Sequence, residues 1–384
     1  MVTKLICDKI ISEGKIFKGN IYTENGKITC VSEKDLPYDE TIDLCGLYVS
    51  PGFIDLHTHG GMGFDFLSND SDEIVKGCNF HLTHGTTSIA PTVSAAPFEK
   101  MYAAAKAISI AKDAPALLGT IIGSHLEGPY LSKNQCGAQC PDFITPPIPA
   151  EYVPLVEELG SSIARWSYAP ENDADGSFCK YISQNGIVPS AGHTDAVYDD
   201  MTRAVENGCK TVTHLYSCTS TITRKGGFRS LGVIESAYLC DDLTCEIIAD
   251  GKHLPPDLIK LIVKIKGTER IIPVTDSLSL AGTEAKHGFM GATEYIIEDG
   301  VCKLCDRSAF AGSIATADVL IRVLTHECEI PLETAVKMMT EQPATLMGLN
   351  KGVLKEGYDA DIIAFDENIN IKTVITKGNK VYNV

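Results

Sequence analysis

The chain has 384 residues, of which 44% are hydrophobic and 22% are charged, and this composition excludes general disorder. Its net charge of −17 argues against nucleic acid and anionic membranes as partners, because both are bound through basic surface. The sequence has neither a run of eighteen apolar residues nor an export signal at its N-terminus, so we expect a cytoplasmic protein.

The two ends of the chain differ in pattern from its middle. Residues 1–50 contain short alternating strands interrupted by the turn sequence ENGK, and residues 352–384 again alternate strands and turns. A chain of this length favours one large domain with a smaller one beside it. We therefore predict a small β-sandwich domain formed by both termini, with residues 51–351 as the large domain.

The middle of the chain repeats a strand followed by a helix. Short apolar runs end in glycine, proline or polar clusters, and they alternate with longer amphipathic segments such as 98–112 and 255–267. Eight such repeats over about 250 residues are typical of a (β/α)₈ TIM-like barrel, an α/β fold. The predicted strands cover residues 53–57, 86–91, 119–128, 163–170, 186–193, 211–215, 244–250 and 270–276.

Ionisable side chains lie where these predicted strands end. In a barrel, the carboxyl ends of the strands form one rim, and this rim carries the chemistry. A lone histidine in an apolar segment is more often a hydrogen-bonded core residue than a ligand. A converging set of imidazoles and carboxylates, however, suits a divalent first-row metal such as zinc or iron, and is costly to bury without a cation. The set consists of His57, His59, His125, Glu127, Glu171, His193, His214, Asp250, His253 and Asp276.

The order of motifs along the chain resembles the amidohydrolase superfamily. The motifs are PGFIDLHTHG, HLEGPY, SAGHTDA, THLYS, IADGKHLPP, VTDS and AGSIATAD. HLEGP followed by AGH and THLY is similar to the N-acetylglucosamine-6-phosphate deacetylases of that superfamily, and the similarity runs almost from end to end. The resemblance implies a metal-dependent hydrolase that removes acetate from an amino sugar phosphate and leaves glucosamine 6-phosphate.

The resemblance also implies a set of metal ligands. Glu127, His193 and His214 would hold the principal metal. His57 and His59 would complete a second site, with Glu127 as the bridging ligand, because some family members have H-x-H here and bind two metals. We therefore expect one or two divalent ions, zinc or iron, in each subunit.

The resemblance makes Asp276 the general base and places His253 in contact with the substrate. When bound, a metal of this kind lowers the pKa of water from 15.7 to about 7 and polarises the amide carbonyl. Asp276 would take the proton from the attacking water and deliver it to the sugar amine as the C–N bond breaks.

The chain departs from the family pattern at three positions that would contact the substrate. Gln139 stands where family members have a histidine that polarises the acetyl carbonyl; its amide can donate a hydrogen bond but carries no positive charge. Ser217 and Cys218 replace the Asn-Ala pair that follows THLY. We therefore expect the step in which the acetyl carbonyl is polarised to be slower than in typical family members, or to differ from it.

The phosphate-binding segment also departs from the family pattern. Family members carry a G-R-E-P stretch whose arginine binds the phosphate, sometimes across a dimer interface, whereas this chain reads SCTSTITRKGGFRSLG. Lys225 falls at the position of that arginine, with Arg224 and Arg229 close by. The three side chains are either an anion pocket or solvated loop charges. We expect a homodimer that binds a small amino sugar phosphate.

Two further hypotheses remain open beside this one. The substrate is either the galacto epimer of the phosphorylated sugar or a different, non-phosphorylated amide. Alternatively, the chain is a catalytically inactive relative that senses a sugar phosphate. The intact set of Glu127, His193, His214 and Asp276 argues against an inactive protein.

Overall fold

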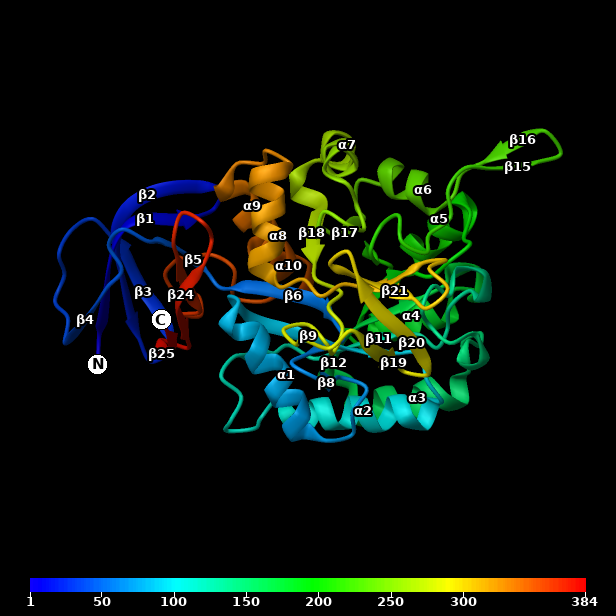
Figure 1. Cartoon of the computed structure of the whole chain (residues 1–384), viewed down its shortest axis with the longest axis horizontal. Coiled ribbons are helices and arrows are strands. Elements are labelled where there is room, and N and C mark those ends of the chain that lie inside the picture. Colours follow the sequence, from blue (N-terminus) through cyan, green and yellow to red (C-terminus); the bar gives the residue numbers. More distant parts are fainter.

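The computed structural model describes residues 1–384 and consists of a barrel with a smaller β-sheet at one end, where both termini lie (Figure 1). The strands of the smaller sheet are β1 (Thr3–Ser12), β2 (Lys15–Glu24), β3 (Lys27–Ser32), β4 (Glu40–Asp43), β5 (Tyr48–Pro51), β23 (Ile362–Phe365), β24 (Ile371–Thr376) and β25 (Asn379–Asn383). They run in the order β25-β24-β23-β5-β1-β2-β3, and β4 pairs with β1. Residues from both ends of the chain therefore share one sheet.

Both faces of this sheet bury apolar side chains. Ile10 and Ile362 belong to a core of 12 buried residues within the small domain. Their neighbours Ile11 and Ile363 belong to the main core of the barrel. Because successive side chains of a strand point to opposite faces, these apolar pairs anchor the small sheet against the barrel.

The barrel has eight parallel strands, and each corresponds to a strand predicted from the sequence. They are β6 (Phe53–Thr58), β9 (Thr86–Ser94), β11 (Ser124–Glu127), β12 (Ile163–Tyr168), β13 (Val188–Ala191), β14 (Thr211–Val212), β17 (Thr244–Ile248) and β18 (Ile271–Val274), with β10 (Thr120–Ile121) preceding β11. The last strand returns to the first, since Asp276 N–H donates to His57 O (2.9 Å) and His59 N–H donates to Ser277 O (2.8 Å). The predicted α/β barrel is confirmed.

Helices surround the barrel and bury one apolar stripe each. In α1 (Ser71–Thr83), Ile74, Cys78 and Leu82 recur every four residues and are buried, while Asp70 caps the helix by accepting from Asp72 N–H (2.8 Å). The other helices are α2 (Phe98–Ala111), α3 (Pro149–Leu159), α4 (Ser177–Gln184), α5 (Tyr198–Glu206), α6 (Val233–Leu239), α7 (Pro256–Lys266), α8 (Ala317–Arg322), α9 (Leu332–Met339) and α10 (Glu341–Met347). None of them combines the length and the apolar character that crossing a bilayer requires.

Three small antiparallel elements were not predicted from the sequence. A four-stranded sheet follows the last barrel strand, and a hairpin projects from the body beside α5 and α6 (Figure 1). A two-stranded ribbon follows β6. The strands are β19 (His287–Met290), β20 (Thr293–Glu298), β21 (Val301–Leu304), β22 (Phe310–Gly312), β15 (Thr223–Lys225), β16 (Phe228–Ser230), β7 (Gly60–Gly61) and β8 (Phe64–Asp65).

Candidate active site

A pocket opens at the carboxyl ends of the barrel strands, under the four-stranded sheet β19–β22. Most of the predicted site residues line it, although they come from many different strands and loops. Its lining includes His59, Glu127, Gln139, His193, His214, Ser217, Cys218, His253 and Asp276, together with Met290 and Phe310 from the four-stranded sheet. The fold thus brings residues more than 200 positions apart into one cavity.

Glu127, His193 and His214 form one compact group of donor atoms at the pocket floor, which we call the first position. Glu127 Oε1 lies 3.2 Å from His193 Nε2 and 3.1 Å from His214 Nε2. The two imidazole nitrogens are 3.2 Å apart. The three side chains are buried, so they meet each other largely without water between them.

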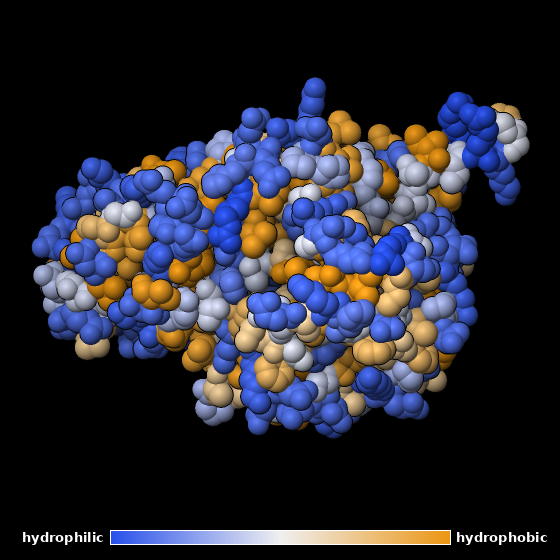
Figure 2. All heavy atoms as spheres, viewed as in Figure 1, coloured by the Kyte–Doolittle hydropathy of each residue, from blue (hydrophilic) through white to orange (hydrophobic).

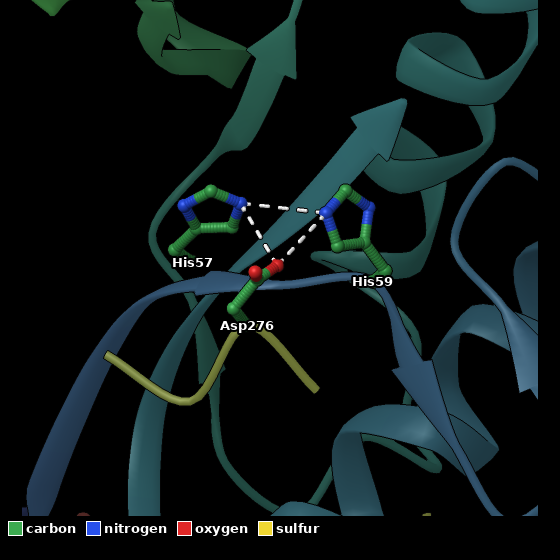
Figure 3. Close-up of side chains that lie close together, drawn as sticks. All are labelled: His57, His59 and Asp276. Atoms are coloured by element: carbon green, nitrogen blue, oxygen red, sulfur yellow. Dashed lines mark hydrogen bonds and ion pairs between the residues drawn. The ribbon is translucent and has the colours of Figure 1, made fainter. Parts of the chain in front are cut away.

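His57, His59 and Asp276 form a second compact group, which we call the second position (Figure 3). Asp276 Oδ1 lies 3.4 Å from His57 Nε2 and 3.2 Å from His59 Nε2, and the two imidazole nitrogens are 3.3 Å apart. Glu127 reaches this group as well, 3.3 Å from His57 and 3.2 Å from His59. Glu127 therefore lies between the two positions.

The hydrogen bonds of the first position determine which nitrogen faces the pocket. His193 Nδ1 donates to Gln135 O (2.9 Å), and His214 Nδ1 donates to Ser217 O (3.1 Å), because a carbonyl oxygen can only accept. Each ring therefore carries its proton on Nδ1 and directs the lone pair of Nε2 toward Glu127. Lone pairs 3.2 Å apart repel unless a proton or a cation lies between them. The donor set fits a divalent metal with imidazole and carboxylate ligands.

Electrostatics in the two positions lead to the same conclusion. Burial works against charge on His57, but Glu127 and Asp276 outweigh it and raise the pKa of His57 to about 10. Burial is likewise outweighed at His59, where Asp276 and Glu127 raise the pKa to about 9. Burial also opposes ionisation of Glu127, yet His57 and His193 hold the pKa of that carboxyl well below its usual range. The carboxylates require positive charge, which a metal would supply in place of histidine protons.

Two of the predicted metal ligands and the predicted general base have a backbone conformation that side chains rarely adopt. His193 (φ 47°), His214 (φ 28°) and Asp276 (φ 47°) lie in the left-handed region, each shortly after a barrel strand. Such residues cost about 1–3 kcal/mol each and persist where the surroundings enforce them. Residues held in this way at the end of a strand turn their side chains over the barrel mouth. The strain supports a functional role for the three.

Gln139 and Glu171 support the ligands through hydrogen bonds. Gln139 Nε2 donates to Glu127 Oε2 (2.6 Å), and Gln139 Oε1 accepts from Ala95 N–H (2.8 Å), which fixes the amide. Glu171 accepts from Thr194 Oγ1 (2.5 Å) and from the N–H of Asp195 (2.7 Å), the two residues that follow His193. Glu171 thus holds the loop that carries His193 rather than lining the pocket.

The remaining predicted residues separate into two groups. His253 lies in the pocket, where its Nδ1 donates to Asp250 Oδ2 (2.9 Å) and its ring meets the edge of Phe310 with 5.0 Å between centroids. Arg224, Lys225 and Arg229 lie elsewhere, on the exposed hairpin β15–β16, and none of them lines the pocket of its own chain.

His125 lies beside the ligands but has its own partners. Its Nδ1 contacts Thr92 Oγ1 (3.1 Å) and its Nε2 contacts Ser167 Oγ (2.7 Å), so both nitrogens are engaged by hydroxyl groups. Its ring packs at right angles on that of His57, 4.5 Å between centroids. His125 is therefore a packing residue beneath the second position.

Met290 and Phe310 are among the pocket residues that the sequence analysis did not identify. Both belong to the four-stranded sheet, a segment for which we predicted no structure. The turn sequence EDG between β20 and β21 was the signal that this segment forms antiparallel strands. No motif indicated that the sheet would fold over the barrel mouth.

Comparisons with known proteins identify relatives of this chain along most of its length. The sequence pattern of the amidohydrolase family matches residues 48–160 and 182–381. An N-acetylglucosamine-6-phosphate deacetylase from Lysinibacillus sphaericus is 29% identical over 375 residues, covering 96% of this chain and 94% of its own. An N-acetylgalactosamine-6-phosphate deacetylase from Shewanella sp. (strain ANA-3) is 28% identical over 388 residues, covering 98% and 96%.

Solved structures extend the likeness to three dimensions. A mutant of N-acetyl-D-glucosamine-6-phosphate deacetylase from Mycobacterium smegmatis, in complex with N-acetyl-D-glucosamine-6-phosphate, matches with a TM-score of 0.92. The two sequences are 26% identical, and the match covers 100% of both chains. The barrel, the small sheet and the segments between them therefore all have counterparts in that enzyme.

Proposed function

From the premise that this chain belongs to the amidohydrolase family, whose members hydrolyse bonds such as amides, we propose that it removes the acetyl group from N-acetylglucosamine 6-phosphate. The products are glucosamine 6-phosphate and acetate. One observation carries the proposal: Glu127 Oε1 lies within 3.2 Å of both His193 Nε2 and His214 Nε2 on the floor of a pocket, in a chain that matches such deacetylases along its whole length.

The enzyme is proposed to depend on a divalent metal, zinc or iron. Glu127, His193 and His214 would hold it at the first position, and His57 and His59, with Glu127 as the bridging ligand, would hold another at the second. A bound cation of this kind lowers the pKa of water to about 7 and polarises the acetyl carbonyl.

Asp276 is the proposed general base. Its carboxylate lines the pocket, and His57 and His59 keep its pKa low although burial opposes this, so the group is ionised and able to accept a proton. Water attacks the acetyl carbon and passes one proton to Asp276. The C–N bond then breaks, and Asp276 returns that proton to the sugar nitrogen. Such proton transfer is worth about 10² to 10⁴ in rate.

Gln139, Ser217, Cys218 and His253 are proposed to contact the substrate, because all four line the pocket. Gln139 donates to Glu127 and has a second amide N–H that can donate to the developing oxyanion. The neutral amide is expected to stabilise that charge less than an imidazolium would.

The phosphate is proposed to be bound by the hairpin of a second copy of the chain. Arg224 lies directly opposite Arg229 in the hairpin, an arrangement of like charges that an anion would neutralise. Phe228 near the tip is 82% exposed, and a two-stranded hairpin that projects alone is only marginally stable. Figure 2 shows this hairpin as a mostly hydrophilic arm that stands clear of the body. A homodimer would let each arm reach the partner's pocket.

The galacto epimer is a second candidate substrate. The observation that favours it is the Shewanella relative, which is named for N-acetylgalactosamine 6-phosphate and is as similar to this chain as the glucosamine enzymes are. The two sugars differ only at one hydroxyl configuration, and the metal site would treat both in the same way.

Acetate release separates these substrates. We expect the highest kcat/KM with N-acetylglucosamine 6-phosphate, lower values with its galacto epimer, and the lowest with the unphosphorylated sugar. A chelator should abolish the activity, and zinc or iron should restore it. Equal rates with and without the phosphate would instead favour a hydrolase of another amide. Activity that persists in metal-free protein would refute the metal-dependent mechanism.

A further inference from the structure

A buried ion pair lies in the barrel interior, directly beneath the second position, and the reaction described above does not use it. Arg165 in β12 and Glu246 in β17 are both fully buried, and Arg165 Nη1 contacts Glu246 Oε1. The other carboxylate oxygen, Glu246 Oε2, lies 3.5 Å from His57 Nδ1. The pair therefore reaches a predicted metal ligand from the side opposite to the pocket.

Arg165 connects the strands that carry the metal ligands. Its guanidinium donates to Leu56 O (3.1 Å), the residue before His57, and to Ser190 Oγ (3.1 Å) on the strand before His193. It also approaches Thr213 Oγ1 (3.5 Å), the residue before His214. The side chain of Arg165 thus contacts the strand segments that directly precede three of the four histidines.

Stability alone does not explain this pair. Burying two charges costs several kcal/mol, and apolar replacements of buried ion pairs are often neutral or stabilising. Arg165 Nε has no hydrogen-bond partner, so the charged group is not even fully satisfied. A pair kept in the core under these conditions points to a role at the neighbouring site.

The four histidines differ in what faces their Nδ1 atoms. His193 and His214 donate to neutral backbone carbonyls, and His59 Nδ1 has no partner. Only His57 faces a carboxylate. A carboxylate behind a ligating histidine fixes the ring and its tautomer and makes the metal-facing nitrogen a stronger donor.

We propose that Glu246, held in place by Arg165, is a positioning residue that keeps the proton of His57 on Nδ1 and sets the affinity of the second position for a divalent metal. The proposal rests on the metal dependence proposed above. It concerns only the second position, because the first position has its own backbone partners.

Zinc titration of the full-length, metal-free protein tests this. We expect wild type to bind two Zn²⁺ per chain. Glu246→Gln should bind the first with unchanged affinity and the second about 10- to 100-fold more weakly. The matched control is Asp173→Asn, a buried carboxylate that accepts from Phe178 N–H and Cys179 N–H and not from any metal ligand. This control should lose stability but keep both affinities.

A double variant distinguishes positioning from a purely structural role. Arg165→Met combined with Glu246→Gln removes both charges, so it should recover thermal stability relative to Glu246→Gln alone. If Glu246 positions His57, the second Zn²⁺ remains weakly bound in the double variant. If its zinc affinity recovers together with its stability, the pair is structural and the proposal is wrong.

Two further outcomes would also overturn the proposal. Wild type binding a single Zn²⁺ would show that no second metal position exists, and equal weakening of both affinities in Glu246→Gln would show general damage. Neither result concerns the proposed deacetylation, which is measured separately as acetate release by the wild-type holoenzyme.

Discussion

The pocket and the projecting hairpin place their charged side chains in opposite environments. Those of the pocket are buried, whereas those of the hairpin are exposed. In the pocket, buried imidazoles and carboxylates from distant strands meet within about 3.5 Å, and the barrel holds them against strain. On the hairpin, three basic side chains are exposed, and neither of the two strands carries an acidic residue. The difference indicates that one chain supplies all residues of the proposed metal site, whereas in our proposal the phosphate is recognised by a second chain.

The largest effect is expected at the residue shared by both metal positions. Glu127→Gln removes the carboxylate that contacts His193, His214, His57 and His59, so metal and acetate release should disappear together. Metal analysis and an acetate assay on the same sample check this. A metal-replete, active Glu127→Gln enzyme would show that the first position is not the metal site.

The second largest effect is expected on the rate of the reaction, without any loss of metal. Asp276→Asn keeps the shape of the side chain but cannot accept a proton, so kcat should fall about 10²- to 10⁴-fold while KM changes little. Steady-state kinetics with isothermal substrate titration measure both quantities. Loss of binding in parallel with rate would mean that Asp276 acts mainly as a metal ligand.

A smaller and more selective effect is expected on the hairpin. If Arg224, Lys225 or Arg229 binds the phosphate, alanine at the responsible position should lower kcat/KM for the phosphorylated sugar about 10- to 100-fold, as expected for one charged hydrogen bond. Hydrolysis of the unphosphorylated sugar serves as the internal control and should hardly change. If no substitution shifts the ratio of the two efficiencies, the phosphate is bound elsewhere or is absent from the true substrate.

The smallest effect on stability is expected at the hairpin tip. Phe228→Ser removes an exposed aromatic ring, so the melting temperature of the fold should stay almost unchanged. If the arm reaches the partner's pocket as proposed, its exposed ring is buried in the dimer, and the variant dimer should dissociate at a higher protein concentration than wild type does. Analytical ultracentrifugation measures this. Unchanged dissociation would exclude the tip from the interface.

The barrel was predictable because each strand is a short apolar run, and all but the second end in or near a chemically distinctive residue. The run before His57 and the run before Asp276 are examples, and the structure places both at one rim. What strand periodicity cannot show is which side chains meet across the barrel. Arg165 and Glu246 each interrupt an apolar strand, but the sequence analysis did not single them out, because only the closed barrel shows that they pair beneath His57.

The loops were less predictable, and for a different reason. The hairpin turn Gly226–Gly227 has two residues in the left-handed region, which glycine adopts without strain, so a hairpin could have been inferred there. Its direction could not, because direction depends on what the hairpin contacts. The roles of Arg224, Lys225 and Arg229 consequently remain predictions that require the partner chain.

Subunit complementation tests the central claim most directly, namely that each pocket uses the hairpin of the other chain. One variant carries Glu127→Gln and keeps its hairpin; the other replaces Arg224, Lys225 and Arg229 by alanine and keeps its pocket. Co-expression should yield mixed dimers in which one of the two pockets is complete, with about one quarter of wild-type activity on the phosphorylated sugar in a random mixture. Activity no higher than the average of the two separate variants would contradict the account.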